Sequence, residues 1–301
     1  MLQGIKTRKL NDINNKKNRK KNRLTPKYIG TYILCIITGL IVLAPFYILI
    51  VTAITSPQEA NYTDFHWWPQ QGVYWRSLYD VLFTKTGDST VLRGLWNTLW
   101  MSIPSVIIGI FTSAMAAYAF AKMKFKAKTF MFSILMFTMM FPNMMNMIAS
   151  FLMFDTIGWV NTPYPLMIPR MFGSITVIFF LKQYYVTLPN DLIEAAKIDG
   201  MDHFGIFWKV AVPLSIPVML AQFIFQFMSA YNDYTNALIY LQDARYYTLQ
   251  LSLAFITDPY TQNWPLRMSG VIVSLIPMLI IYTIAQKYIT QGMSVTAGLK
   301  G

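Results

Sequence analysis

The sequence predicts an all-α membrane protein with six transmembrane helices and with both termini in the cytoplasm. Hydrophobic residues make up 55% of the 301 positions and charged residues only 13%, which excludes a disordered chain and an average soluble domain. A helix needs about 20 apolar residues to cross the hydrocarbon core of a bilayer. Six apolar runs reach that length, at residues 30–54, 97–121, 129–153, 164–184, 213–240 and 268–289.

The positions of the basic residues orient these spans. Ten of the 25 Lys and Arg residues precede Thr31, and alternate loops contain most of the others. Counted loop by loop, 19 lie on the side of the N-terminus and six on the opposite side. The excess of positive charge therefore predicts that both termini and the loop at 186–212 are cytoplasmic.

The basic segment 1–29 is expected to be a disordered cytoplasmic tail beside anionic lipid headgroups, with residues 30–289 forming the membrane domain and 290–301 a second cytoplasmic tail. The tail is too long and the following apolar run too extended for a cleavable signal peptide. A net charge of +12 is also typical of nucleic-acid-binding proteins, but here the basic residues are concentrated in this tail. We expect membrane lipid and no nucleic acid as its partner.

Metal chemistry is not expected for this chain. Cys35 is the only cysteine, and His66 and His203 are the only histidines, so a zinc site cannot be assembled from these residue types. Four tryptophans in the outer segment 56–96 suit a membrane-interface belt: Trp67, Trp68, Trp75 and Trp96.

The second and third spans contain features of helices packed inside a membrane protein. Small residues recur at three- and four-residue steps in the second span, which allows close helix approach, at Ser113, Ala114, Ala117 and Ala121. The third span is rich in methionine, consistent with lipid-facing bulk or with adaptable packing. Pro142 should kink it, and Asn143 and Asn146 are expected to need buried partners or water.

The fifth span contains a stripe of polar residues. The steps of four, three, four and three fit one face of a continuous helix, through Gln222, Gln226, Ser229, Asp233 and Asn236. Such a stripe should face protein or a water-filled cavity. Gln222, Gln226, Ser229 and Asp233 of this stripe, together with Asn143 and Asn146 of the third span, are interpreted as a substrate pathway. Hydrogen bonding between helices without any ligand is the alternative.

The loop between the fourth and fifth spans is predicted to form two short helices joined by a hinge. Asp191 and Glu194 have the spacing of a capping box, and Gly200 can adopt the left-handed conformation that ends the first helix. Asp202 can start a second helix that ends before Pro213. Ala196 and Gly200 are four residues apart, so a face without bulky side chains would let another surface approach.

This loop resembles the EAA loop of permeases from binding-protein-dependent ABC importers. The matching positions are Glu194, Ala195, Ala196, Asp199, Gly200, Phe207, Pro213 and Pro217. The resemblance implies the type I ABC importer permease fold. It also implies that Glu194, Ala195, Ala196, Asp199 and Gly200 couple the chain to an ATPase.

Other segments resemble the carbohydrate-uptake branch of the same family, of the maltose-transporter type. They are the run from Asn97, residues 116–122, residues 231–233, where Tyr231 replaces a tryptophan, and the ending at 292–301. In this branch the last outer loop contacts a solute-binding protein. The resemblance therefore assigns a receptor contact to Asp243, Arg245, Asp258 and Trp264.

The resemblance implies a transport subunit and not an enzyme. Its expected partners are a second homologous permease in a heterodimer, two ATPase subunits, an extracytoplasmic sugar-binding protein and membrane lipid. The sequence has no phosphate-binding G-x-x-x-x-G-K-[ST] loop, so we expect no cofactor on this chain, with ATP and Mg²⁺ on the ATPase. The alternatives are a secondary carrier, a membrane-embedded enzyme and a membrane assembly protein. The first two would need more ionisable residues within the spans.

Overall fold

The computed structural model describes residues 26–61, 66–83, 85–86, 89–256 and 263–298. The chain divides into two compact units, residues 1–52 and 53–301. In the first unit, α2 (Pro26–Ala53) is a 28-residue helix with Pro45 inside it. At 1.5 Å per residue it is about 42 Å long, enough to cross a bilayer.

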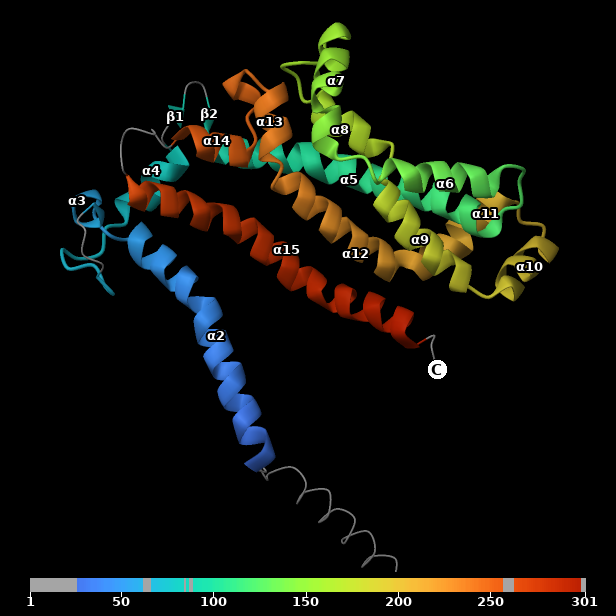
Figure 1. Ribbon diagram of the computed structural model, residues 1–301, viewed down its shortest axis with the longest axis horizontal. Coiled ribbons are helices and arrows are strands. Elements are labelled where there is room, and N and C mark those ends of the chain that lie inside the picture. Colours follow the sequence, from blue (N-terminus) through green and yellow to red (C-terminus); the bar gives the residue numbers. More distant parts are fainter. Residues whose placement is uncertain (1–25, 62–65, 84, 87–88, 257–262, 299–301) are drawn as a thin grey trace, which may run out of the picture. The chain divides into compact units, whose positions relative to one another are not determined.

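Helix α5 (Val91–Lys122) is central to the second unit (Figure 1). It packs against α8 (Tyr164–Met171), α9 (Ile175–Thr187), α12 (Val212–Tyr231) and α14 (Leu249–Ile256). Three of its predicted small residues, Ser113, Ala114 and Ala117, are completely buried. They form the close seam that their spacing predicted, because small side chains let neighbouring backbones approach.

Shorter elements frame the two ends of this unit. They are α3 (Pro57–Ala60), α4 (Arg76–Phe83), the antiparallel pair β1 (Lys85–Thr86) and β2 (Ser89–Thr90), α10 (Asn190–Ile198), α11 (His203–Ile206), α13 (Tyr234–Tyr240) and the 3₁₀ turn η2 (Ala244–Tyr246). The π-helical segment η1 (Phe207–Ala211) joins α11 to α12.

The prediction of a continuous third transmembrane helix at 129–153 is wrong. The segment instead forms α6 (Lys128–Thr138) and α7 (Asn143–Thr156), of 11 and 14 residues. Pro142 lacks an N–H and disfavours helical geometry at Phe141, and α6 ends just before it in i→i+3 hydrogen bonds such as Phe141 N–H to Thr138 O. The described residues therefore contain five helical stretches long and apolar enough to span a membrane, not the expected six.

Two other spans differ from the prediction, one by an interruption and one at its ends. The stretch Tyr164–Thr187 is interrupted after α8, where Gly173 has a φ of 101°. The last helix, α15 (Trp264–Gly298), contains Pro277 and starts before the predicted residue 268. It also continues into the segment at 290–301 that was expected to be a tail.

Candidate coupling loop and transport pathway

Helix α10 begins the predicted coupling loop, but its start differs from the expectation. The N-cap position is Pro189, without a side-chain cap, and Asn190 is the first helical residue. The expected capping box of Asp191 and Glu194 is therefore wrong. Asp191 lies inside the first turn, where a carboxylate interacts favourably with the positive end of the helix dipole.

The end of α10 is the left-handed turn that the sequence predicted. Gly200 has a φ of 81° and donates its N–H to Lys197 O at 3.0 Å, while Met201 N–H bonds to Ala196 O at 3.0 Å. These two bonds form a Schellman motif, which satisfies the last carbonyls of the helix. Since an L side chain rarely adopts this φ, glycine is required for the turn itself.

Helix α10 has one face against this chain and one face open. Ile193 and Ala196 are buried, and Ala196 is only 5% exposed within the main hydrophobic core. The expected small-residue face for a partner is therefore not formed, because Ala196 packs on the chain itself. Of the five predicted coupling residues, the other four are exposed: Glu194, Ala195, Asp199 and Gly200. Two apolar side chains share the open surface, Leu192 and Ile198, the latter 86% exposed.

Lys122 ties the entry of this loop to the end of α5. Its Nζ donates to the carbonyl oxygen of Leu188 at 2.6 Å and to Asn190 Oδ1 at 2.8 Å. The ammonium group thus joins the link between α9 and α10 to the central helix. Charge-assisted bonds of this kind are stronger than those between neutral groups.

The second helix of the loop does not end before Pro213 as expected. Asp202 caps α11 by accepting from Gly205 N–H at 2.8 Å, which confirms the predicted start. The chain then continues through η1 into α12 as one helical stretch, His203–Tyr231. Val212 N–H bonds to Phe207 O across the wider π-helical turn, directly before the proline that cannot donate a hydrogen bond.

The polar stripe predicted on the fifth span is interrupted. Helix α12 ends at Tyr231, and Asp233 instead caps α13 by accepting from Asn236 N–H at 3.2 Å. The prediction of one continuous helix over 213–240 is therefore wrong, because the Asp233 carboxylate caps a new helix. Gln222 is buried, Ser229 is exposed, and Gln226 Nε2 lies 3.5 Å from Ser174 Oγ at the α8–α9 break.

Asp233 also forms an ion pair that links α8 to the start of α13. Arg170 Nη2 lies 3.4 Å from Asp233 Oδ2, with side-chain exposures of 23% and 17%. This pairing was not predicted, because charge counting along the sequence assigned Arg170 to an outer loop. A lone arginine in an apolar run needs a carboxylate partner, and that signal was available from the sequence.

The break between α8 and α9 rests on α5. Thr112 Oγ1 donates to Met171 O at 2.9 Å, and Ser113 Oγ accepts from Ser174 N–H at 2.9 Å. A Cβ added to Gly109 would collide with the carbonyl oxygen of Arg170. The small residues of α5 thus supply both the space and the hydrogen bonds for an interrupted helix.

The two asparagines of the predicted third span, Asn143 and Asn146, are not placed beside the polar residues of α12. Asn143 is the first residue of α7, and its side chain lies outside the described residues. Asn146 is exposed, contrary to the expectation that it is buried. Among the described residues, no hydrogen bond joins it to Gln222 or Gln226.

The last outer loop is held by interactions that cross the chain. Arg245 Nη2 lies 2.6 Å from Asp243 Oδ2, and hydrogen bonds from Arg245 lower the pKa of the Asp243 carboxyl. Asn161 Oδ1 accepts from the N–H groups of Gln242 and Asp243, at 3.1 and 2.7 Å. Trp264 contacts the Arg267 guanidinium, 5.4 Å from ring centroid to Cζ, whereas Asp258 lies outside the described residues.

The start of α5 fastens the same loop. Asn97 Nδ2 donates to the carbonyl oxygens of Arg245 and Tyr247, both at 2.9 Å. Thr98 Oγ1 accepts from Leu249 N–H at 2.8 Å. The run from Asn97 resembles the permease family, but its sequence did not predict these contacts, which join positions about 150 residues apart in the chain.

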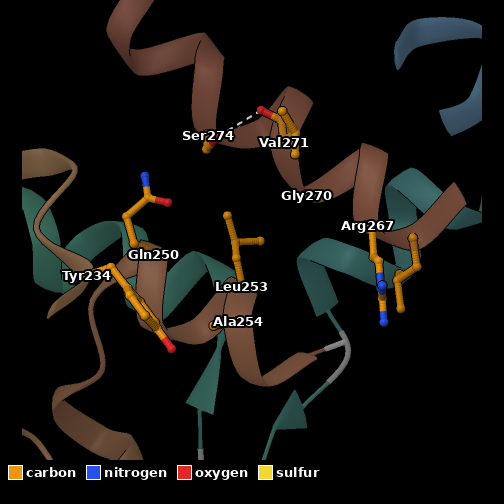
Figure 2. A pocket seen from close by; sticks show the side chains of 9 residues that line it. Tyr234, Gln250, Leu253, Ala254, Arg267, Gly270, Val271 and Ser274 are labelled. Atoms are coloured by element: carbon orange, nitrogen blue, oxygen red, sulfur yellow. Dashed lines mark hydrogen bonds between the residues drawn. The ribbon is translucent and has the colours of Figure 1, made fainter. Parts of the chain in front are cut away.

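A cavity of about 410 Å³ lies beside this loop, between α14 and α15 (Figure 2). Gln250 and Leu253 project from α14 toward the α15 segment at Gly270 and Ser274, with Tyr234 at one edge. An aromatic ring and an amide on apolar walls are typical of small-molecule sites. None of these residues was predicted as part of the pathway.

Comparisons with known proteins agree with this architecture. Residues 95–295 match the family described as the binding-protein-dependent transport system inner membrane component. The arabinooligosaccharide transport system permease protein AraQ of Halalkalibacterium halodurans is 32% identical over 222 residues, 73% of this chain and 77% of that protein. The maltose/maltodextrin transport system permease protein MalG of Yersinia pestis is 28% identical, covering 91% of this chain and 94% of that protein.

A solved structure shares the fold. It belongs to a bacterial ABC transporter involved in the import of the acidic polysaccharide alginate, with a TM-score of 0.75 and 22% identity. The match covers 89% of this chain and 99% of that one. The family match over residues 95–295 and the 32% identity to AraQ establish that the chain belongs to the inner membrane components of binding-protein-dependent transport systems.

Proposed function

We propose that this chain is a permease subunit of an ATP-driven ABC importer that moves a sugar or oligosaccharide into the cell. The observation that carries the proposal is the family match over residues 95–295, with relatives named for arabinooligosaccharide and maltodextrin transport. The chain is a multi-pass component of the bacterial cytoplasmic membrane, in agreement with its long apolar helices.

The proposed assembly contains a second homologous permease, two ATPase subunits and an extracytoplasmic sugar-binding protein. ATP and Mg²⁺ bind to the ATPase subunits, and this chain holds no cofactor of its own. The exposed surface of α10 supports this arrangement, because two large apolar side chains, Leu192 and Ile198, stand beside Glu194 and Asp199. An apolar strip flanked by charge suits a helix lying in a groove of another protein.

The proposed mechanism uses the coupling loop as a lever. Closure of the ATPase pair moves α10, and the Schellman turn at Gly200 passes this movement to α11, η1 and α12. ATP and the loaded receptor each bind the outward-facing state more tightly, which is the thermodynamic condition for coupling. Gln222, Gln226, Ser229 and Asp233 are then proposed to line the sugar pathway. Asn143 and Asn146 are proposed to contribute to the same pathway in the assembled importer.

The outer loop is proposed as the receptor contact. Asp243 and Arg245 lie on a turn that Asn161 and Asn97 fix to the body of the chain. A fixed turn loses little conformational entropy when a partner binds. Asp258 and Trp264 belong to the same proposed surface.

Two glycine variants test the lever directly, in the importer reconstituted with its ATPase and sugar receptor. Gly200 and Gly158 both have positive φ values, 81° and 71°, and a Cβ on either meets nothing within 4 Å. The two substitutions therefore impose similar backbone strain. Gly200→Trp should abolish labelled-sugar uptake while membrane insertion persists, and Gly158→Trp should retain uptake.

Charge reversal gives a second test of the same surface. Glu194→Lys should also abolish uptake, while Glu194→Gln should retain a measurable part of it, because the amide preserves the shape of the side chain. Normal uptake by Gly200→Trp would overturn the docking model.

A further inference from the structure

A hollow of about 540 Å³ lies at the corner where α5 ends and α6 begins. The side chains that matter for its chemistry are Lys124, Phe125, Lys128, Thr129 and Phe130. The connecting loop joins two apolar helices, and a loop with several lysines is too costly to place in the hydrocarbon core. The hollow therefore lies at the membrane surface, where it borders both water and lipid.

This corner has an excess of positive charge. Every second residue of the loop is a lysine, at Lys122, Lys124, Lys126 and Lys128, and the sequence has no acidic residue at 89–154. In the part of the chain that the structure describes, none of these four lysines forms an ion pair. A fifth ammonium group, Lys182 Nζ, lies 3.8 Å from the ring centroid of Phe132 on α6. The corner therefore attracts an anion from outside the chain.

The lysines of the loop keep hydrogen-bond donors for such an anion. Lys128 Nζ donates to Met123 O at 3.0 Å and to Ala121 O at 3.4 Å, which leaves one of its three N–H donors. The side chains of Lys124 and Lys126 are exposed. These groups can turn toward a ligand without breaking a bond that holds the fold together.

An apolar stripe continues from the hollow along α6. Phe130, Ile134 and Phe137 are 68%, 46% and 59% exposed, and their steps of four and three residues place them on one face of the helix. We call these three residues the α6 stripe. It rises about 10 Å from its first residue to its last. Because Phe130 belongs to both the hollow and the stripe, the charged site and the apolar site are continuous.

This continuity distinguishes between the possible occupants. A soluble anion contacts only the lysines and leaves the α6 stripe uncovered. A zwitterionic lipid covers the stripe but has no net charge to offer the lysines. An anionic lipid uses both parts, and each lysine near a membrane surface raises the affinity for it about fivefold.

We propose that the corner between α5 and α6 is a binding site for one anionic phospholipid. Its phosphate group lies in the hollow and bonds to Lys124 and Lys128, and Lys126 reaches it from the loop. One acyl chain lies along the α6 stripe. The site is separate from the basic segment 1–29 and from the sugar pathway, and it does not depend on which molecule is transported.

Binding is measured by native mass spectrometry on the purified full chain, with phosphatidylglycerol and phosphatidylcholine of identical acyl chains. Phosphatidylglycerol should bind about 100-fold more tightly, the effect of three lysines. The double variant Lys124→Gln/Lys126→Gln should weaken its binding about 25-fold and leave phosphatidylcholine unchanged. Lys197→Gln/Lys209→Gln is the matched control, because it removes the same charge from two exposed lysines outside the corner. The control should bind phosphatidylglycerol as the native chain does.

The α6 stripe is tested by a second pair of variants. Phe130→Ala should weaken the binding of both lipids severalfold, because both lose the same apolar contact. Phe180→Ala, at an exposed phenylalanine of α9, should weaken neither. Inorganic phosphate should not displace phosphatidylglycerol, since it cannot cover the stripe.

Several outcomes would overturn the proposal. Equal affinities for the two lipids, or equal losses in the two double-lysine variants, would show that the corner does not select an anionic lipid. Displacement by inorganic phosphate would assign the corner to a soluble anion. Equal losses in the two phenylalanine variants would remove the acyl-chain contact from α6.

A protein partner is the remaining alternative, and it is tested by repeating the titration with the assembled importer. Phosphatidylglycerol binding should persist there. Binding that disappears on assembly would assign the corner to a contact with another subunit. The first titration uses the chain alone, so failure of the proposed transport function would leave its result standing.

Discussion

The outer and inner ends of the membrane unit are held together in different ways. At the outer end, side chains bond to backbone groups far away in the chain, as Asn97 does with Arg245 and Tyr247. At the inner end, α10 depends on Lys122, on two buried side chains and on its own Schellman turn. The outer loop is thus held by bonds between residues about 150 positions apart in the chain, whereas α10 is joined to α11 through the turn at Gly200, which supports the proposed lever.

The largest effect is expected from Asn97→Ala. Two carbonyl oxygens lose their donor and Trp100 Nε1 loses its acceptor at 3.2 Å. Unsatisfied buried groups of this kind should cost roughly 2 to 3 kcal/mol of stability. Thermal unfolding in nanodiscs measures the loss, with the exposed Asn146→Ala as the control. Equal melting temperatures for the two variants would show that the outer end is not fixed by Asn97.

Gly109→Ala should have the next largest effect. The added methyl group collides with the carbonyl oxygen of Arg170, and overpacking of this kind typically costs about 1 to 3 kcal/mol. At the hinge, a Cβ on Gly205 meets the Asp202 carboxylate at 3.0 Å, and that side chain can move aside. In the same unfolding assay, Gly205→Ala should therefore be milder. The comparison fails if Gly205→Ala is the more destabilising of the two.

Lys122→Met should reduce transport more than stability. The variant loses the bonds to Leu188 O and Asn190 Oδ1, at a cost of about 1.5 kcal/mol in unfolding free energy, the lower end for hydrogen bonds to a charged group. Because these bonds position α10, uptake and receptor-stimulated ATPase activity should both fall strongly. Lys126→Met, at an exposed lysine of the neighbouring loop, should be neutral. A large stability loss without loss of coupling would contradict the hinge interpretation.

The smallest effect is expected from the pH dependence of the outer turn. Arg245 lowers the pKa of the Asp243 carboxyl below its ordinary value of 3.8. The contribution of this pair to stability is therefore present above that ordinary value and is lost as pH falls through the lowered pKa. Asp243→Asn should therefore lower the melting temperature slightly at neutral pH and leave it unchanged in acid, where the native carboxyl is already protonated. An equal shift at neutral and acid pH would show that the Asp243 charge is not responsible.

Local signals in the sequence were sufficient to predict part of the structure of the coupling loop. Gly200 and Asp202 act through their own backbone or their nearest neighbours, and both behave as predicted. Pro142 was recognised as a kink, but the pattern could not show that the helix breaks completely there. At Pro213 the helix was predicted to end, but it continues, because a π-helical turn accommodates the proline.

Tertiary contacts account for the remaining differences. The spacing of Ala196 and Gly200 described a small face correctly, but it could not show that Ala196 packs on this chain. The contacts of Arg170 with Asp233 and of Asn97 with the outer loop join residues 63 and about 150 positions apart. Such pairs depend on how helices pack, which periodicity alone does not determine.

The most direct test of the central claim is a cysteine cross-linking measurement on α10. Cys35, the single native cysteine, is replaced by serine, and cysteine is introduced at Ile198, which is 86% exposed, or at Met144, which is 80% exposed. In the assembled importer, Ile198→Cys should cross-link to the ATPase subunit and Met144→Cys should not. Cross-linking of Met144→Cys but not of Ile198→Cys would contradict the assignment of α10 as the coupling helix.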